Sequence, residues 1–253
     1  MSNSNQTKFK SVLNKILNRA PMPTALKDRS DYKSTWNHLA ANQQEAANYV
    51  AGHGTVEEEL NHTGQHTVEI LDRFIGIKPD DIILEIGCGV GRVGKLLSRR
   101  CSKWIGVDIS ERMLHFASQR LKGLDNIELV ELSTAGLKEI PDSSVNVVYC
   151  TVVFMHLYEW DRYKYVEESF RVLRPGGRCF FDNVDITSDH GWQVFTEGYK
   201  YTPGNRPAQL SMVSTGDELE TYARKAGYCN IRIHRWDSAW VGVTGVKPEP
   251  IES

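Results

Sequence analysis

The stretch that decides the fold is Ile82-Ile83-Leu84-Glu85-Ile86-Gly87-Cys88-Gly89-Val90-Gly91-Arg92. Its first five residues form the apolar run of a buried strand, and three glycines at alternate positions lead into a helical segment. Glycine lets the backbone turn tightly and approach a ligand closely, and the free N–H groups of a helix start favour a polar or anionic group. The stretch therefore predicts a ligand site at a strand-to-helix turn.

Apolar strands and amphipathic helices alternate along the chain from about residue 80. The expected strands are 82–86, 103–108, 127–131, 145–150 and 178–183, and the expected helices lie near 91–100, 111–121 and 161–173. Such alternation is typical of a parallel sheet that helices cover on both faces.

The C-terminal part departs from this alternation. After residue 184, a stretch that is expected to be rich in loops leads to a helix at 216–227, and two strands follow closely at 230–235 and 239–245. The residues that indicate loops there are Gly191, Gly198, Pro203, Gly204 and Pro207. Because a short connection cannot make a parallel crossover, we expect these two strands to form an antiparallel hairpin.

Residues 1–54 are expected to form a helical arm or cap. Basic residues and the apolar spacing of residues 8–19 favour a short amphipathic helix. Three interpretations stay open: weak contact with an anionic membrane surface, a targeting peptide, or an arm packed on the domain. A second helix is expected over 31–50, and a third begins near Thr55, with Glu58 placed for a capping box.

Composition narrows the class of protein. The 253 residues carry 30 Lys and Arg against 32 Asp and Glu, a formal charge of -2, so no dedicated nucleic-acid surface is expected. No apolar run approaches the ~18 residues of a transmembrane helix, and no charged n-region followed by an apolar h-region opens the chain, so we do not expect a secretory signal. Five scattered cysteines exclude a disulfide framework or zinc finger. We therefore expect a reducing, cytoplasmic location.

The charges near the glycine stretch distinguish two classes of nucleoside cofactor. Asp108 ends the second strand, where an acid can accept both hydroxyls of a ribose. Residues 89–94 formally satisfy the G-x-G-x-x-G dinucleotide pattern, which keeps a nicotinamide dehydrogenase as an alternative. Glu85, however, would repel a pyrophosphate and attract the ammonium and sulfonium of S-adenosylmethionine. The charges favour S-adenosylmethionine.

Three motifs carry a resemblance to a known family: E-I-G-C-G-V-G-R at 85–92, G-V-D-I-S at 106–110 and L-R-P-G-G at 173–177. Together they resemble the class I S-adenosylmethionine-dependent methyltransferases, over roughly residues 55–245. The resemblance implies an α/β fold with a Rossmann-like, doubly wound, seven-stranded sheet, mostly parallel with an antiparallel last strand. The methyltransferase domain would cover 55–248, with a substrate-side insertion at 184–215 and a tail at 249–253.

The resemblance also implies roles for particular residues. Glu85 would reach the ammonium of the methionine portion, Asp108 would hold the ribose and Ile109 would pack on the adenine. The loop after the fourth strand, with Thr151, borders the transferred methyl in the family. Family members often carry Asp soon after the third strand, where this chain reads Glu131-Leu132-Ser133, so Ser133 or a backbone carbonyl would contact the adenine amino group. They also often carry Asp early in the fourth strand, where this chain has Asn146. The residues expected to line the methionine portion are Gly87, Cys88 and Gly89.

The acceptor side is less defined. His156 is a candidate general base, although it resembles a family histidine that is usually structural. Aromatic walls with a few polar groups would suit a small, partly apolar acceptor methylated on O, N or C. The candidate substrate residues are Trp36, Trp192, Phe195, Tyr199 and Arg206. No metal site is expected, because His62 and His66 lack a supporting acid motif.

The leading hypothesis is an enzyme that transfers a methyl group to a small molecule and releases S-adenosylhomocysteine. A nucleic-acid methyltransferase would need a basic excess or an Asn/Asp-Pro-Pro-Tyr/Phe motif after the fourth strand, where this chain reads Tyr149-Cys150-Thr151-Val152. A protein methyltransferase and a non-catalytic cofactor-binding module remain alternatives. The sequence predicts neither the acceptor nor the oligomeric state.

Overall fold

A computed structural model describes residues 29–51, 56–202 and 205–250. The expected basic helix at 8–19 and the capping residue near Thr55 lie outside the described residues. Among the described residues, no helix is long and apolar enough to cross a membrane.

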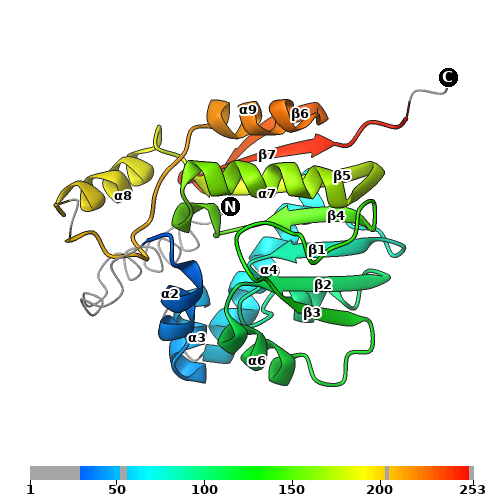
Figure 1. Cartoon of the computed structure of the whole chain (residues 1–253), viewed down its shortest axis with the longest axis horizontal. Helices are drawn as coiled ribbons and strands as arrows, with labels where there is room; N and C mark the ends of the chain where they lie inside the picture. Colours follow the sequence, from blue (N-terminus) through cyan, green and yellow to red (C-terminus); the bar gives the residue numbers. More distant parts are fainter. Residues whose placement is uncertain (1–28, 52–55, 203–204, 251–253) are drawn as a thin grey trace.

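The described residues form a seven-stranded sheet in the order β3-β2-β1-β4-β5-β7-β6 (Figure 1). The parallel part consists of β1 (Ile82–Ile86), β2 (Lys103–Asp108), β3 (Ile127–Glu131), β4 (Val145–Cys150) and β5 (Leu173–Val184). The last strand, β7 (Trp240–Val246), runs antiparallel to both neighbours, β5 and β6 (Cys229–Trp236). The expected doubly wound sheet and its antiparallel last strand are confirmed.

Alternating apolar side chains of the strands enter two separate cores. On β4, Val147 and Tyr149 pack in the core that α4 (Val56–Phe74) and α5 (Gly94–Leu97) cover, whereas Val148 and Cys150 pack in the core under α7 (Glu159–Val172) and α9 (Gly216–Ala226). A run apolar at every position is what a strand buried on both faces requires. Helix α6 (Glu111–Arg120), between β2 and β3, is capped by Ser110, whose hydroxyl accepts a hydrogen bond from the Met113 N–H at 3.2 Å.

The expected helix over 31–50 is two helices, α2 (Tyr32–Leu39) and α3 (Gln43–Ala51). The break has a local cause. Asn42 accepts a hydrogen bond from the Glu45 N–H at 2.9 Å and so starts a new helix, after the backbone at Ala40 has left helical geometry.

A second correction concerns the stretch expected to be loop, because it contains α8 (Asp189–Tyr199). Ser188 caps this helix by accepting from the Gly191 N–H at 2.9 Å. Gly191 was one of the residues that indicated a loop, but it lies within the helix where a Cβ would come 1.8 Å from the Asp185 carbonyl oxygen. The glycine therefore allows close packing of the helix and does not break it.

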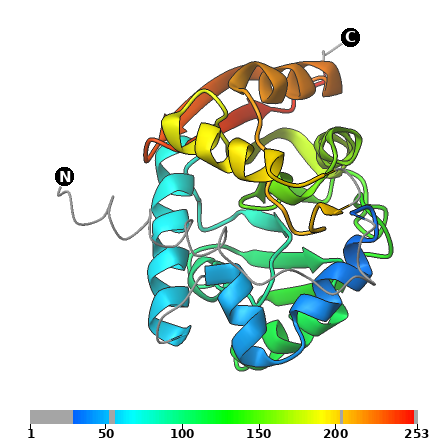
Figure 2. The same ribbon diagram turned by 90° about the vertical axis from the view of Figure 1, so that its left-hand side faces the viewer.

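The helices outside the doubly wound core gather at one edge of the sheet. Figure 1 draws α2, α3 and α8 beside the same ends of the strands, and Figure 2 looks onto that edge. These are the carboxyl ends of the parallel strands, since residues that follow β1, β2 and β4 share a pocket with residues of α2 and α3. Open α/β sheets bind ligands at this edge.

Candidate cofactor site

The loop after β1 has a backbone that requires glycine. Gly87 and Gly89 have φ of +69° and +53°, in the left-handed region. A Cβ on Gly87 would lie 2.4 Å from Val153 Cγ2, and one on Gly89 would lie 2.9 Å from Val50 Cγ2. The glycines therefore serve both the turn and the close approach of two other segments, one after β4 and one in α3.

Asp108, the last residue of β2, ties this loop to the start of α6. Its Oδ2 accepts from the Gly89 N–H and its Oδ1 from the Ser110 N–H, both at 2.9 Å. Burial raises the pKa of this carboxyl to about 6, although these N–H groups oppose the rise. Each carboxylate oxygen has a further lone pair, so two more donors can bind. Ser110, and not Asp108, is the N-cap of α6.

Glu85 lies on β1 and pairs in register with Tyr149 of β4. The Tyr149 hydroxyl donates to Glu85 Oε2 at 2.5 Å. The carboxyl is buried, which raises its pKa to about 7, while the hydrogen bond from Tyr149 and the positive charge of Arg92 act in the opposite direction. Glu85 is thus a buried acid held by a neighbouring strand, and not a surface-facing strand end.

Arg92 is a buried cation of the site. Its Nη1 donates to the Thr63 carbonyl and to Thr67 Oγ1, both at 2.8 Å and both on α4. Its guanidinium is attracted to Glu85 and to a further buried acid, Asp182, whose pKa burial raises to about 7. Three buried carboxyls, those of Glu85, Asp108 and Asp182, therefore lie around the glycine loop with one buried arginine. Because the acids outnumber the arginine, the site favours a cationic ligand.

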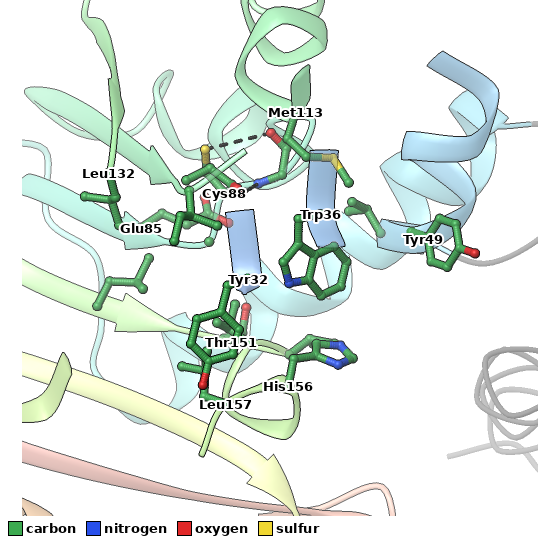
Figure 3. A pocket seen from close by; sticks show the side chains of 18 of the residues that line it. Tyr32, Trp36, Tyr49, Glu85, Cys88, Met113, Leu132, Thr151, His156 and Leu157 are labelled. Atoms are coloured by element: carbon green, nitrogen blue, oxygen red, sulfur yellow. Dashed lines mark hydrogen bonds between the residues drawn. The ribbon is translucent and has the colours of Figure 1, made fainter. Parts of the chain in front are cut away.

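The glycine loop, Glu85, Arg92 and Asp108 line one pocket, which Figure 3 shows from close by. The sequence-predicted residues that line it are Trp36, Glu85, Gly87, Cys88, Gly89, Asp108, Ile109, Thr151 and His156. The pocket is apolar apart from its acids, Arg92 and a few polar side chains. Burial raises the pKa of the Cys88 thiol well above its usual range, so this side chain acts as a small neutral wall.

Helix α2 covers the pocket and is fixed to both sides of it. The Tyr32 hydroxyl donates to Asp161 Oδ2 at 2.6 Å and accepts from the Tyr158 N–H at 3.1 Å, at the start of α7. On the other side, the Ser110 hydroxyl donates to Asn37 Oδ1 at 2.7 Å. The cap therefore bridges the loops that follow β2 and β4, across the ends of the strands.

Trp36 of α2 also lines the pocket, and its ring lies edge-on to His156, with ring centroids 4.9 Å apart (Figure 3). His156 closes a short turn of 3₁₀ helix (Phe154–His156) after β4. A hydrogen-bonding imidazole beside an aromatic wall can position a small ligand or accept a proton from it.

Other predicted residues lie elsewhere. The Ser133 hydroxyl donates to Glu139 Oε1 at 2.7 Å, and the preceding Leu132 lines the pocket in its place. Phe195, Tyr199 and Arg206 line a second cavity. Trp192 stacks on Phe195 and is 55% exposed. The structure thus brings Trp36, alone among the candidate substrate residues, to the cofactor pocket.

Asn146, which stands where family members often carry Asp, also lies outside the pocket. Its Oδ1 accepts from the Ile82 N–H at 3.0 Å. The amide therefore joins β4 to the start of β1 and has a structural use.

Sequence reasoning missed Tyr32, Tyr149 and Arg92 as residues of the site. Tyr32 is four positions before Trp36, so helical spacing could have placed both on one face. Tyr149 could have been found only from the register between β1 and β4, and Arg92 only from the way α4 packs on the loop. Within the described residues, no cluster of three or more His, Cys, Asp or Glu could hold a metal ion.

Comparisons with known proteins agree with this geometry. Residues 84–181 match a family model described as a methyltransferase domain. A relative from Amycolatopsis mediterranei (strain S699), 27-O-demethylrifamycin SV methyltransferase, is 29% identical over 182 residues, which are 69% of this chain and 65% of the relative. Phosphoethanolamine N-methyltransferase 1 of Arabidopsis thaliana is 28% identical over 47% of this chain and 24% of its own length. The chain thus spans less than two thirds of either relative.

A comparison with solved structures agrees on the fold. A solved structure of Haemonchus contortus phosphoethanolamine N-methyltransferase 2 in complex with S-adenosyl-L-methionine has a TM-score of 0.62 at 16% identity. The match covers 85% of this chain and 60% of that one. Residues 84–181 thus form a methyltransferase domain, and the relatives and the fold support the class I S-adenosylmethionine-dependent methyltransferase superfamily, whose members take S-adenosylmethionine as methyl donor. The predicted family and methyl donor are confirmed.

Proposed function

We propose that this protein transfers a methyl group from S-adenosylmethionine to a small-molecule acceptor. The observation that carries the proposal is the position of Glu85 and Asp108. Both are buried carboxyls at the carboxyl ends of adjacent strands, on either side of a loop that only glycine can form. These two carboxylates, which attract cations and accept hydrogen bonds, suit a ligand with an ammonium, a sulfonium and a ribose diol.

The residues of the pocket suggest how the ligand is held. Glu85 binds the ammonium of the methionine portion, directly or through water, and Asp108 accepts from the two ribose hydroxyls with its remaining lone pairs. Ile109 and Leu132 pack on the adenine. Gly87 lets the methionine portion approach the backbone, since a side chain there would fill the space beside Val153.

When bound, S-adenosylmethionine supplies the methyl group, which moves to the acceptor atom as its bond to sulfur breaks and leaves neutral S-adenosylhomocysteine. Such a displacement needs alignment of the nucleophile and exclusion of water. Tyr32 and Trp36 of the cap provide both, because they lie over the strand ends. His156 accepts the proton if the acceptor atom enters protonated.

A small acceptor is favoured over a macromolecule. Helices α2 and α3 enclose the pocket, and Tyr32 and Asn37 hold α2 to two loops. A nucleic acid would also need a basic surface, whereas the chain carries a formal charge of -2. The two relatives are named for different acceptors, 27-O-demethylrifamycin SV and phosphoethanolamine, so the acceptor has to come from experiment.

The first test is isothermal titration of the purified protein with S-adenosylhomocysteine, with NAD as the control ligand. Binding of S-adenosylhomocysteine alone supports the proposal. Binding of NAD alone would overturn it in favour of a dehydrogenase. With binding established, transfer of a labelled methyl group to candidate small molecules, with tRNA and a protein extract as controls, distinguishes the acceptor classes.

A further inference from the structure

A second cavity of about 520 Å³ lies beside the cofactor pocket. It is lined by the last turns of α8, by the segment 206–213, by the start of α7 and by Arg29 at the beginning of the described chain. Its size is that of sites that bind small organic molecules. The second cavity is not part of the cofactor pocket, because the two share no lining residue.

A thin wall of backbone separates the two spaces. The Met212 N–H donates to the Met155 carbonyl at 2.7 Å, and Met155 directly precedes His156 of the cofactor pocket. Arg29 Nη2 donates to the same Met155 carbonyl at 3.1 Å and also to the Leu210 carbonyl. The second cavity therefore adjoins the Trp36–His156 end of the first pocket, where the acceptor is expected.

The charge of the second cavity is opposite to that of the first. Arg29 and Arg206 line it against a single acid, Glu159. Burial lowers the pKa of Arg29 to about 10, which leaves the guanidinium charged at neutral pH. Its bonds to the Met155 and Leu210 carbonyls both use Nη2, so the guanidinium has a further amino group, Nη1, with which a carboxylate can form charge-assisted hydrogen bonds.

The walls of the cavity are apolar. Phe195 and Tyr199 project from α8 and are 42% and 80% exposed, and Trp192 stacks on Phe195 with ring centroids 5.3 Å apart. Leu210 and Val213 line the side made by the segment 206–213. Exposed aromatic side chains at the rim of a cavity can cover the apolar body of a ligand whose charged end lies deeper.

We propose that this cavity binds an amphipathic organic carboxylate, with the carboxylate on Arg29 and Arg206 and the apolar body against α8. Since the cavity adjoins His156, the ligand is the acceptor, or the part of it that the protein recognises; this last step rests on the proposed methyltransferase function. The binding itself does not depend on that function.

The test is titration of the protein, saturated with S-adenosylhomocysteine, with 4-phenylbutanoate and with its neutral counterpart 4-phenylbutanol. We expect the acid to bind at least about tenfold more tightly than the alcohol, since the alcohol lacks the charge-assisted hydrogen bonds. Arg206→Gln should weaken the acid about tenfold, and Glu159→Gln should tighten it. Lys200→Gln, which removes an exposed cation of the α8 C-cap that does not line the cavity, is the matched control and should change nothing.

The outcomes separate the two proposals. Equal binding of acid and alcohol, equal effects of Arg206→Gln and Lys200→Gln, or absence of saturable binding would overturn the carboxylate site. Arg206 is exposed, so its replacement does not threaten the fold. If S-adenosylhomocysteine binds and 4-phenylbutanoate does not, the carboxylate site fails and the methyltransferase proposal stands. If the acid binds and S-adenosylhomocysteine does not, the methyltransferase proposal fails.

Discussion

The two cavities of this protein are built in different ways. The cofactor pocket is formed by backbone at the ends of β1, β2 and β4, and its acids Glu85 and Asp108 are buried. The second cavity is formed by side chains of α8 and of a connecting segment, and its cation Arg206 and aromatic Tyr199 are exposed. A site set by the sheet allows little variation, whereas a site on a helix and a loop can change its ligand without disturbing the sheet.

The strongest test of this difference is a single methyl group in the glycine loop. Gly87→Ala should abolish S-adenosylhomocysteine binding, with a loss of more than about 100-fold, because the added Cβ meets Val153 at 2.4 Å and displaces the loop. Gly76→Ala is the matched control. Gly76 also has a positive φ, +63°, but has open space around its Cβ position. Calorimetry with circular dichroism checks both, and wild-type affinity in Gly87→Ala would contradict the assigned loop.

Asp108→Asn should weaken S-adenosylhomocysteine by roughly 10- to 100-fold, since the two ribose hydroxyls lose a charged acceptor. The control is Asp182→Asn, which neutralises another buried acid with a raised pKa outside the pocket lining. The amide oxygen that this control introduces can still accept from the Val152 N–H, as the Asp182 carboxylate does. Equal losses in the two variants would mean that total charge, and not the position of Asp108, determines affinity.

Glu85→Gln should stabilise the protein without ligand above neutral pH. The pKa of Glu85 is about 7 in the folded protein and 4.5 when unperturbed. Between these values the folded state holds a proton that the unfolded state has lost, so this group makes the wild type less stable as pH rises. We expect the variant to gain on the order of 1–3 kcal/mol over wild type by about pH 8, and nothing near pH 4.

Urea unfolding across this pH range measures the gain. The same variant should bind S-adenosylmethionine more weakly, because it no longer offers a charge to the ammonium. If the free energy of unfolding of the variant and of the wild type differed by the same amount at every pH from 4 to 8, Glu85 would not titrate in this range.

Tyr149→Phe should have a smaller effect of about 3- to 10-fold on the affinity for S-adenosylmethionine at neutral pH. Loss of the hydroxyl removes one hydrogen bond to Glu85 and raises the pKa of its carboxyl further, so less of it is ionised. The affinity should recover as pH rises above that pKa. Tyr228→Phe removes a buried hydroxyl that donates to the Val166 carbonyl and not to Glu85, and serves as control. A pH-independent loss would exclude an action through Glu85.

The smallest effect is expected for His156→Gln, which should leave S-adenosylhomocysteine affinity unchanged because the carboxyls carry the binding. With an acceptor in hand, a loss of turnover at unchanged stability would identify His156 as a base. Unchanged turnover would mean that His156 only lines the pocket beside Trp36.

The features of the cofactor pocket that depend on local sequence could be predicted. The bounds of β1 to β4 agree with the expected ranges. β1, β2 and β4 are buried along most of their length and are apolar at most positions, whereas β3 is an edge strand in which apolar residues are interrupted by exposed Glu128 and Glu131. The glycine loop and Asp108 could be found because their spacing is local. β5 begins at Leu173, five residues before the expected start, since Leu173 pairs with Val145 ahead of an irregularity in the ladder.

Features that depend on tertiary packing could not be predicted in this way. α8 was missed because Gly191, normally a sign of a loop, lies where the helix contacts the Asp185 backbone. The bond between Tyr149 and Glu85 depends on register, and the position of Arg29 beside the segment 206–213 joins residues that are far apart in the chain. Trp192, Phe195, Tyr199 and Arg206 were chosen for composition, which does not distinguish one cavity from another.

The strand order has a consequence for how the chain folds. Among the described strands, β7 is synthesised last, yet it lies between β5 and β6. β6 therefore has no place in the sheet until the hairpin with β7 exists, and β5 presents an unpaired edge until then. During translation the glycine-loop half can assemble from local βα units, while the half beside α8 has to wait for residues 240–246. A nascent chain would accordingly form its cofactor pocket before its sheet is complete.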